Sequence, residues 1–335
     1  MKKHKLTIVL VISIIVASLM SLFIGAYGVT LEGLFNQDYN QVMLMLSSRI
    51  PRLLAILCTG IGMSVAGLIM QNLCMNKFVS PSTGATISSA QLGIIVGLIF
   101  IPSASLAQRT AFSFIAAILG TWIFVWFIQN IKFKDVIMVP LIGVMFNSVI
   151  GGIVSYLAYE NDLTQILSSI LVGDFSLVLA GRYEIVFLVI PLVIIAFIYA
   201  NHFNIVGMGE SFSTNLGVNY KLVMFGGLSI SAVITASIVV TVGTISYIGL
   251  IIPNIVAMFK GDKIKGNLID VALFGALFTL ICDVIGRSVI KPFELPISLI
   301  SGIIGSALFI VLLYQKLSPK KSRKKRVSKE VIVNG

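Results

Sequence analysis

The side chains best suited to specific chemistry are two arginines, Arg49 and Arg52, and the later pair Asp283 and Arg287. Arg49 and Arg52 stand three residues apart, so in a helix they share one face. A guanidinium binds carboxylates through a planar fork of N–H donors. The spacing therefore predicts recognition of a partner's carboxylates, with simple snorkelling of span-end arginines as the alternative. Asp283 and Arg287, four apart, could instead form an internal ion pair.

The sequence shows no set of side chains with the composition or spacing of a catalytic or metal site. Cys58, Cys74 and Cys282 lie in or near apolar stretches without metal-ligand spacing, and we expect them to be small buried hydrophobes. His4 and His202 are isolated. No nucleophile–base set, catalytic carboxylate pair or phosphate-binding glycine loop can be assembled. We therefore predict a non-enzyme with no cofactor, no metal and no ATP site of its own.

Membrane spans are the elements that must position these side chains. Hydrophobic residues make up 57% of the 335 residues, charged residues 11%, and the mean hydropathy is +1.03. A soluble domain carries about 25% charged residues, and a span needs about 20 apolar ones. Ten stretches have or approach that length: 6–28, 53–72, 84–101, 110–130, 136–158, 184–202, 221–245, 247–260, 268–290 and 295–316.

The predicted fold class is an all-α polytopic membrane protein with about ten transmembrane helices. It forms a single domain over residues 1–335, and residues 317–335 are a basic tail. Pro253, with close glycines before it, predicts a broken or half-length helix at the eighth stretch. Residues 29–48 are expected to be a polar connection, and 159–183 to lie along the membrane surface as one or two short helices.

The distribution of Lys and Arg predicts the orientation of the chain. With the N-terminus inside, the inner segments and the tail hold most of the 24 basic residues. The outer segments then hold only Arg49, Arg52, Arg109, Arg182, Arg287 and Lys291. An even number of spans puts both termini in the cytoplasm. The first stretch follows a basic start, as a signal peptide does, but its apolar core is too long, which favours an uncleaved anchor.

The net charge of +11 does not require a nucleic-acid partner. The basic residues of the tail directly follow the last span, where anionic lipid of the inner leaflet attracts them. We therefore expect membrane lipid, and no nucleic acid, as the partner of this charge.

Three further segments are polar or broken by Gly and Pro at membrane borders. Residues 67–84 run from Gly67 through Gln71 into an inner polar turn. Residues 207–218 are too polar for the bilayer and predict a short cytoplasmic helix with Glu210 in its first turn. Such a helix suits docking to a soluble partner, or it is a surface connector. Residues 243–254 predict a sharp turn at membrane depth.

Taken in order, these segments closely resemble the FecCD-type permeases of ABC importers for ferric siderophores, haem and cobalamin. The resemblance covers about residues 44 to 316. Its motifs have counterparts in Arg49–Arg52, Gly67–Gln71 with Asn76–Pro81, Gly209–Gly217 and Gly243–Asn254. The chain looks most like Gram-positive permeases for catecholate siderophores of the petrobactin type. Ser80, Asn254 and Tyr247 depart from the usual acidic residue, histidine and phenylalanine of the family.

The resemblance implies a type II ABC importer permease in a bacterial cell membrane, driven by ATP and Mg on a separate ATPase. It implies a dimer with a second copy or a similar permease, and a siderophore-binding protein outside. ATPase coupling is expected at Gly209, Glu210, Leu216 and Gly217, and binding-protein docking at Arg49, Arg52 and Arg287.

Candidate residues for the translocation path are Met63, Ser64, Met70, Asn147 and Ser148, although packing explains each of them equally well. Within the ABC importer hypothesis, the alternative is a haem or cobalamin permease of the same family. The alternative to an ABC importer is an ion-coupled secondary transporter, which would use intramembrane charges such as Asp283.

Overall fold

The computed structural model of the chain describes residues 2–25, 30–130, 138–181, 183–261, 264–290 and 292–317, and the regular elements in these ranges are all helices. In chain order they are α1 (Lys2–Phe23), α2 (Leu31–Phe35), α3 (Tyr39–Leu44), η1 (Met45–Arg49), α4 (Ile50–Leu73), α5 (Thr86–Phe100), α6 (Leu106–Asn130), α7 (Met138–Glu160), α8 (Thr164–Leu171), η2 (Glu184–Leu188), α9 (Val189–Ile198), α10 (Ala200–Val206), α11 (Glu210–Asn215), α12 (Tyr220–Val242), α13 (Ile248–Lys260), α14 (Ile264–Ser288) and α15 (Ile297–Leu317).

Each of the ten predicted stretches coincides with a helix or a bent helix pair. Within the described ranges six helices are long and apolar enough to cross a membrane. Residues 184–206 add a seventh if η2–α9 and α10, which are bent by 62°, count as one span. The other three stretches are shorter apolar helices, within α5, α13 and α15. The fold class is therefore the predicted all-α membrane type. Arg182, Lys132, Lys134, Lys263, Lys291 and the tail from residue 318 lie outside the described residues.

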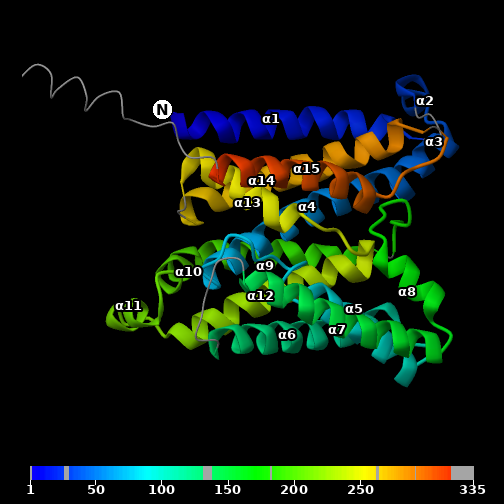
Figure 1. Cartoon of the computed structure of the whole chain (residues 1–335). Helices are drawn as coiled ribbons and strands as arrows, with labels where there is room; N and C mark the ends of the chain where they lie inside the picture. The colour runs from blue at the N-terminus through cyan, green and yellow to red at the C-terminus, as the bar shows by residue number, and fades with distance from the viewer. Residues whose placement is uncertain are drawn as a thin grey trace, which may run out of the picture.

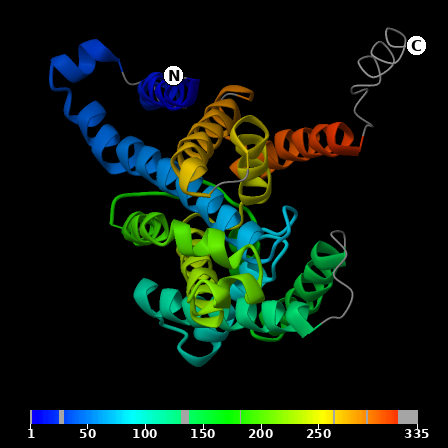
Figure 2. The same ribbon diagram turned by 90° about the vertical axis from the view of Figure 1, so that its left-hand side faces the viewer.

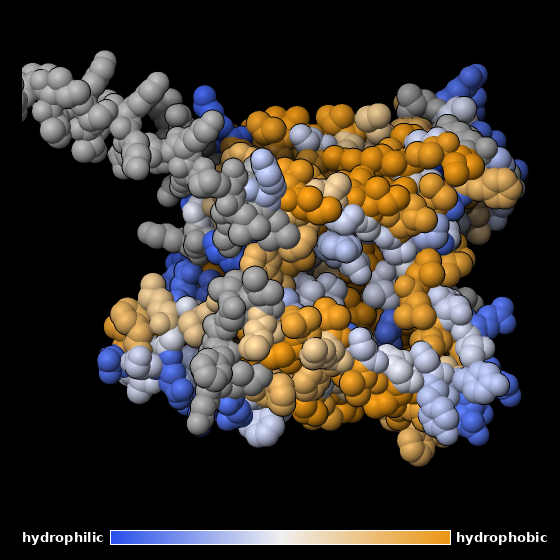
Figure 3. Space-filling view, viewed as in Figure 1, coloured by the Kyte–Doolittle hydropathy of each residue, from blue (hydrophilic) through white to orange (hydrophobic). Residues whose placement is uncertain are grey.

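The helices form two groups separated by α4, which crosses between them (Figures 1 and 2). Helices α1, α13, α14 and α15 lie along one side, and α5, α6, α7 and α12 along the other. The beginning of α1, the end of α15 and the protruding α11 share one end of the bundle, called here the α11 end. The opposite end carries α2, α3 and α8 and is called the α2 end. Figure 3 shows a broad hydrophobic band between two more hydrophilic ends.

The second predicted span begins much earlier than expected. Residues 29–48 were predicted to be a polar connection, but helical structure starts at Tyr39 and continues for 35 residues to Leu73. The side chain of Asp38 caps this helix by accepting the N–H of Asn40 at 3.0 Å. The turn Met45–Arg49 is a π-helix that leads directly into α4. The N-cap aspartate was the sequence signal for this start.

Pro51 explains why the helix widens at this turn. Proline lacks an N–H, and its ring clashes with the carbonyl four residues earlier, which belongs to Ser47. That carbonyl accepts the backbone N–H of Ala180 at 3.0 Å instead. The freed acceptor thus ties the start of α4 to the segment before η2.

The seventh and eighth spans are separate helices, α12 and α13, joined by a tight turn. Gly243 ends α12 with a φ of +93°, and Tyr247 precedes α13 with a φ of +71°. Pro253 lies inside α13 and leaves the Gly249 carbonyl without its helical donor. Gln71 of α4 supplies the donor, at 3.2 Å. The predicted break therefore lies at 243–247, before the proline.

Small residues let α4 approach its neighbours at two points. A Cβ added at Gly67 would overlap the Gly249 carbonyl of α13, and one added at Gly60 would overlap the Gly275 carbonyl of α14. Close backbone contact of this kind stabilises helix pairs where lipid provides no hydrophobic driving force. Gly60 and Gly67 therefore serve helix packing.

We predict that Gly67→Ala destabilises the protein, because the new methyl group meets backbone that cannot move without separating α4 from α13. Overpacking of this kind costs about 1–3 kcal/mol. Thermal unfolding of detergent-purified protein, followed by size-exclusion chromatography, measures the loss. Gly226→Ala on α12 is the matched control, since a Cβ there has no atom within 4 Å. Equal melting temperatures for the two variants would contradict the close-contact role.

Candidate functional site

Arg52 is the centre of a buried ionic cluster at the α2 end, formed by Arg49, Arg52, Asp283, Arg287 and Glu294. Its Nη2 lies 2.7 Å from Asp283 Oδ1, and its Nε donates to the same oxygen at 3.2 Å. Its Nη1 lies 2.5 Å from Glu294 Oε2. Arg52 thus joins α4 to α14 and to the connection between α14 and α15.

Arg287 completes the other side of the cluster. Its Nη2 lies 2.6 Å from Asp283 Oδ2, so the internal ion pair foreseen from the four-residue spacing is confirmed. Its Nη1 also donates to the carbonyls of Ser21 at 2.9 Å and Ile24 at 2.6 Å. Arg49 donates to the Ile24 carbonyl as well, at 2.8 Å. The two arginines together hold the end of α1 against α4 and α14.

From the sequence, Arg49 and Arg52 suit docking by an exposed position in an outer segment, but the expected exposure is wrong for this chain. Each residue is only 7% exposed, and Arg287 is 2% exposed. All three lie at the α2 end, and local spacing could not predict that Arg52 binds Asp283 and Glu294, which lie 231 and 242 residues from it in sequence. Their predicted docking role is not tested by this geometry and stays a prediction.

At the opposite end, α11 has the form predicted for residues 207–218, in a shorter version. The helix proper spans Glu210–Asn215 between two glycines with positive φ, Gly209 at +108° and Gly217 at +75°. Such angles strain any residue with a Cβ. Ser213 is fully buried and bonds the Ile205 carbonyl at 3.0 Å, which fixes α11 on α10. Glu210 and Leu216 are exposed.

Three exposed apolar side chains lie on α11 and directly beside it and are called here the apolar stripe. Phe212 lies in α11, Leu216 is its C-cap residue, and Met208 precedes the N-cap Gly209. Met208, Phe212 and Leu216 are 64%, 46% and 56% exposed. Large apolar side chains on a polar, protruding helix are typical of a surface that another protein covers. Of these three residues, only Leu216 was among the coupling residues expected from the sequence.

The five candidate path residues separate into two groups. Met63, Ser64 and Met70 are buried within the contacts of α4, so in this chain they meet protein on every side. Asn147 of α7 is half-buried, accepts from Ser88 and donates to the Ser82 carbonyl, both at 2.8 Å. Ser148 is exposed. The structure does not test the lining role of any of them.

The three departures from the family motifs are integrated into local contacts. Ser80 is fully buried, and its N–H donates to the Thr83 hydroxyl at 2.9 Å. The Asn254 amide bridges the carbonyls of Lys77 and Leu250 at 2.8 and 2.7 Å. Tyr247 occupies the strained residue before α13. Asn254 thus joins the polar turn at 76–84 to α13, while Gln71 joins α4 to α13.

Sequence reasoning missed a second charged pair, at the α11 end of α14. Asp270 is buried, forms an ion pair with Lys260 and accepts the Thr7 hydroxyl at 2.6 Å. An acid inside an apolar stretch is itself a signal, because an ionised side chain in a span needs a partner. Helix α14 therefore carries one neutralised carboxylate towards each end.

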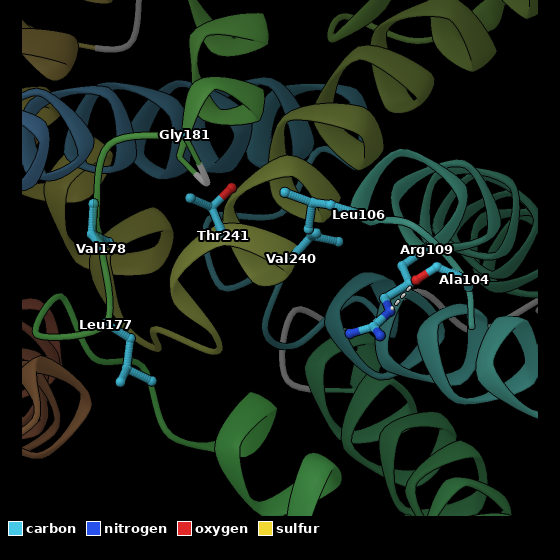
Figure 4. A pocket seen from close by; sticks show the side chains of 8 residues that line it. All are labelled: Ala104, Leu106, Arg109, Leu177, Val178, Gly181, Val240 and Thr241. Atoms are coloured by element: carbon cyan, nitrogen blue, oxygen red, sulfur yellow. Dashed lines mark hydrogen bonds between the residues drawn. The ribbon is translucent and has the colours of Figure 1, made fainter. Parts of the chain in front are cut away.

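Arg109, expected on the outside, lines a cavity of about 550 Å³ at the α2 end (Figure 4). Its Nε donates to the Ala104 carbonyl at 3.1 Å, while Leu106, Val240 and Thr241 line the neighbouring wall. Across the described part of the chain, no three His, Cys, Asp or Glu residues group as metal ligands would.

Comparisons with known proteins find matches along nearly the whole chain. The family model described as the FecCD transport family matches residues 12–315. The petrobactin import system permease protein YclN of Bacillus subtilis is 44% identical over 92% of this chain and 97% of its own. The ferric-anguibactin transport system permease protein FatD of Vibrio anguillarum is 38% identical over 88% and 93%. A solved metal-chelate type ABC transporter in an inward-facing conformation is similar with a TM-score of 0.79 and 25% identity, over 93% of this chain and 99% of that one.

We predict that Asp283→Asn strongly destabilises the protein, because it leaves two buried guanidinium groups facing a neutral amide. Breaking a buried pair by removing one partner costs about 3–5 kcal/mol. The melting temperature in detergent and the yield of folded membrane protein measure the effect. Glu160→Gln, at an exposed position of α7, is the control with the same change of charge. Normal stability of the Asp283 variant would mean that the cluster does not hold the three helices together.

Proposed function

The chain belongs to the FecCD transport family, and on that premise we propose that it is the permease subunit of an ABC importer that carries a ferric siderophore into the cytoplasm. The observation that carries the proposal is similarity along nearly the whole chain to permeases named for petrobactin and ferric-anguibactin transport. The 44% identity to a petrobactin permease favours a siderophore of that type over haem or cobalamin.

We further propose that the α11 end is cytoplasmic and the α2 end extracellular, with both termini inside. The support is the excess of Lys and Arg in the segments assigned to the α11 end, including Lys77, Lys221, Lys260 and Lys265. The basic charges assigned outside are few, and three of them belong to the ionic cluster.

The proposed mechanism is alternating access driven from α11. A cytoplasmic ATPase that binds ATP and Mg would cover Met208, Phe212 and Leu216, with Gly209 and Gly217 fixing the direction of the helix. Closure of the ATPase then acts on the permease as a rigid-body push. This chain would need no ATP site or other cofactor of its own.

Besides the ATPase, the proposed partners are a siderophore-binding protein at the α2 end and, within the membrane, a second permease copy or a similar permease. Arg49, Arg52 and Arg287 would attract the binding protein's carboxylates. The exposed Ser148 and the half-buried Asn147 make α7 the best candidate to line a path shared with the second permease.

An ion-coupled secondary transporter is less well supported. Such a mechanism needs an intramembrane acid that can gain and lose a proton or cation. Asp283 lies between Arg52 and Arg287, and Asp270 is paired with Lys260. Both carboxylates are already neutralised by fixed cations, which favours a structural role.

We predict that Glu210→Lys abolishes siderophore uptake while the permease still inserts normally, because the charge change falls in the first turn of α11 at the proposed ATPase contact. Uptake of radiolabelled ferric siderophore by intact cells and the amount of permease in membranes are the two measurements. Glu160→Lys, the same substitution at the opposite end, should retain uptake. Full uptake by the Glu210 variant would count against coupling through α11.

The proposed sidedness predicts a labelling pattern. In a variant that lacks Cys58, Cys74 and Cys282, E160C should react with a membrane-impermeant maleimide in intact cells, because Glu160 is exposed at the α2 end. E210C should react only after the membrane is opened. The reverse pattern would invert the assigned orientation.

A further inference from the structure

The two carboxylates bound to Arg52 differ in burial and in the element that carries them. The side chain of Asp283 is 2% exposed and belongs to the middle of the cluster, where it also pairs with Arg287. The side chain of Glu294 is 21% exposed and contacts Arg52 through one oxygen, at 2.5 Å from Nη1. Movement of Asp283 would take a carboxylate from both Arg52 and Arg287, whereas Glu294 serves Arg52 alone among the described contacts and can turn outward into water.

Glu294 belongs to the short connection between α14 and α15. The next residue, Leu295, donates its N–H to the Gly286 carbonyl at 3.0 Å, and this bond holds the connection to α14 independently of Glu294. Phe293 on the other side is exposed. Release of Glu294 would therefore remove one ionic tie between α4 and the α14–α15 pair and leave the other, through Asp283, in place.

We propose that Glu294 is an internal stand-in for a carboxylate of the extracellular binding protein. In the resting permease it occupies the outward nitrogen of Arg52, and on docking the partner's carboxylate replaces it. The proposal rests on the proposed function, in which Arg52 contributes to docking. It reconciles that role with the burial of Arg52, because the guanidinium does not have to be exposed beforehand.

The net charge of the cluster before and after docking favours such an exchange. The cluster holds three guanidinium groups and two carboxylates, so its five side chains carry a net charge of +1. When Glu294 turns outward, the remaining four carry +2, and an incoming carboxylate restores the original value. Arg52 is paired before and after, so the desolvation cost of an unpaired buried charge is avoided. A neutral or cationic group on the partner would not satisfy the site.

The exchange also couples docking to the contacts between membrane helices. Glu294 ties the α14–α15 connection to α4, and the partner's carboxylate would bind Arg52 without making that tie. Docking thus loosens one contact between two spans while it adds one to the partner. Sensing of the bound partner at the α2 end would begin with this loss.

The test is the affinity of the permease–ATPase complex, reconstituted in lipid nanodiscs, for the siderophore-loaded binding protein that supports uptake by the same complex. We expect Glu294→Gln to bind about five- to thirty-fold more tightly than the parent, because the internal competitor is weakened. Glu294→Asp, which keeps the charge but shortens the reach, should lie between the two. Glu184→Gln at the same end is the control, since Glu184 accepts only the Gly181 N–H among its described contacts.

Two results would overturn the proposal, and they are distinguishable. Unchanged or weaker binding by Glu294→Gln in an intact complex, while Arg52→Gln binds at least tenfold more weakly, would leave Arg52 as a docking residue and reduce Glu294 to a structural contact. Unchanged binding by Arg52→Gln would remove the docking role on which the exchange rests. Tighter binding by Glu294→Gln together with weaker binding by Arg52→Gln supports it.

Discussion

The carboxylate of Asp283, buried within a helix long enough to cross a membrane, is the constraint on which the arrangement at the α2 end depends. A charge in that position must be neutralised by the protein itself. Arg52 and Arg287 do so from two helices. The excess donors of Arg287 and of the neighbouring Arg49 then converge on the last turn of α1. One buried acid thereby orders the ends of three helices and one connection.

Buried backbone carbonyls that have lost their helical donor also need a partner within the protein, although they carry no charge. Pro51 and Pro253 each free the carbonyl four residues earlier, and an unsatisfied carbonyl in a membrane costs several kcal/mol (about 2–7). Ala180 takes up the first, and Gln71 the second. The prolines therefore do more than distort α4 and α13. They create acceptors through which segments distant in sequence are fixed to one another.

These ionic and hydrogen-bonded contacts tie several helices into one framework. Helix α14 is tied at one end to α13 and α1 through Asp270, and at the other to α4 through Asp283 and to α1 through Arg287. Two more accessible features stand apart from this framework: the apolar stripe at the protruding α11, and Glu294 at the α2 end. Each is a position where an added protein could act on a rigid body, which is the form of motion that alternating access requires.

The sequence by itself determined the ten apolar stretches, the all-helical class, the short polar helix around Glu210 and the Asp283–Arg287 pair. All of these follow from patterns within a few residues, and local patterns survive folding. Only the tertiary structure decided that Arg49 and Arg52 are buried, that helix begins at Tyr39, and that Asp270 and Glu294 belong to ionic contacts. The reason is physical: the burial of a charge depends on where its counter-charge lies, and Arg52 meets its two carboxylates more than 200 residues further along the chain.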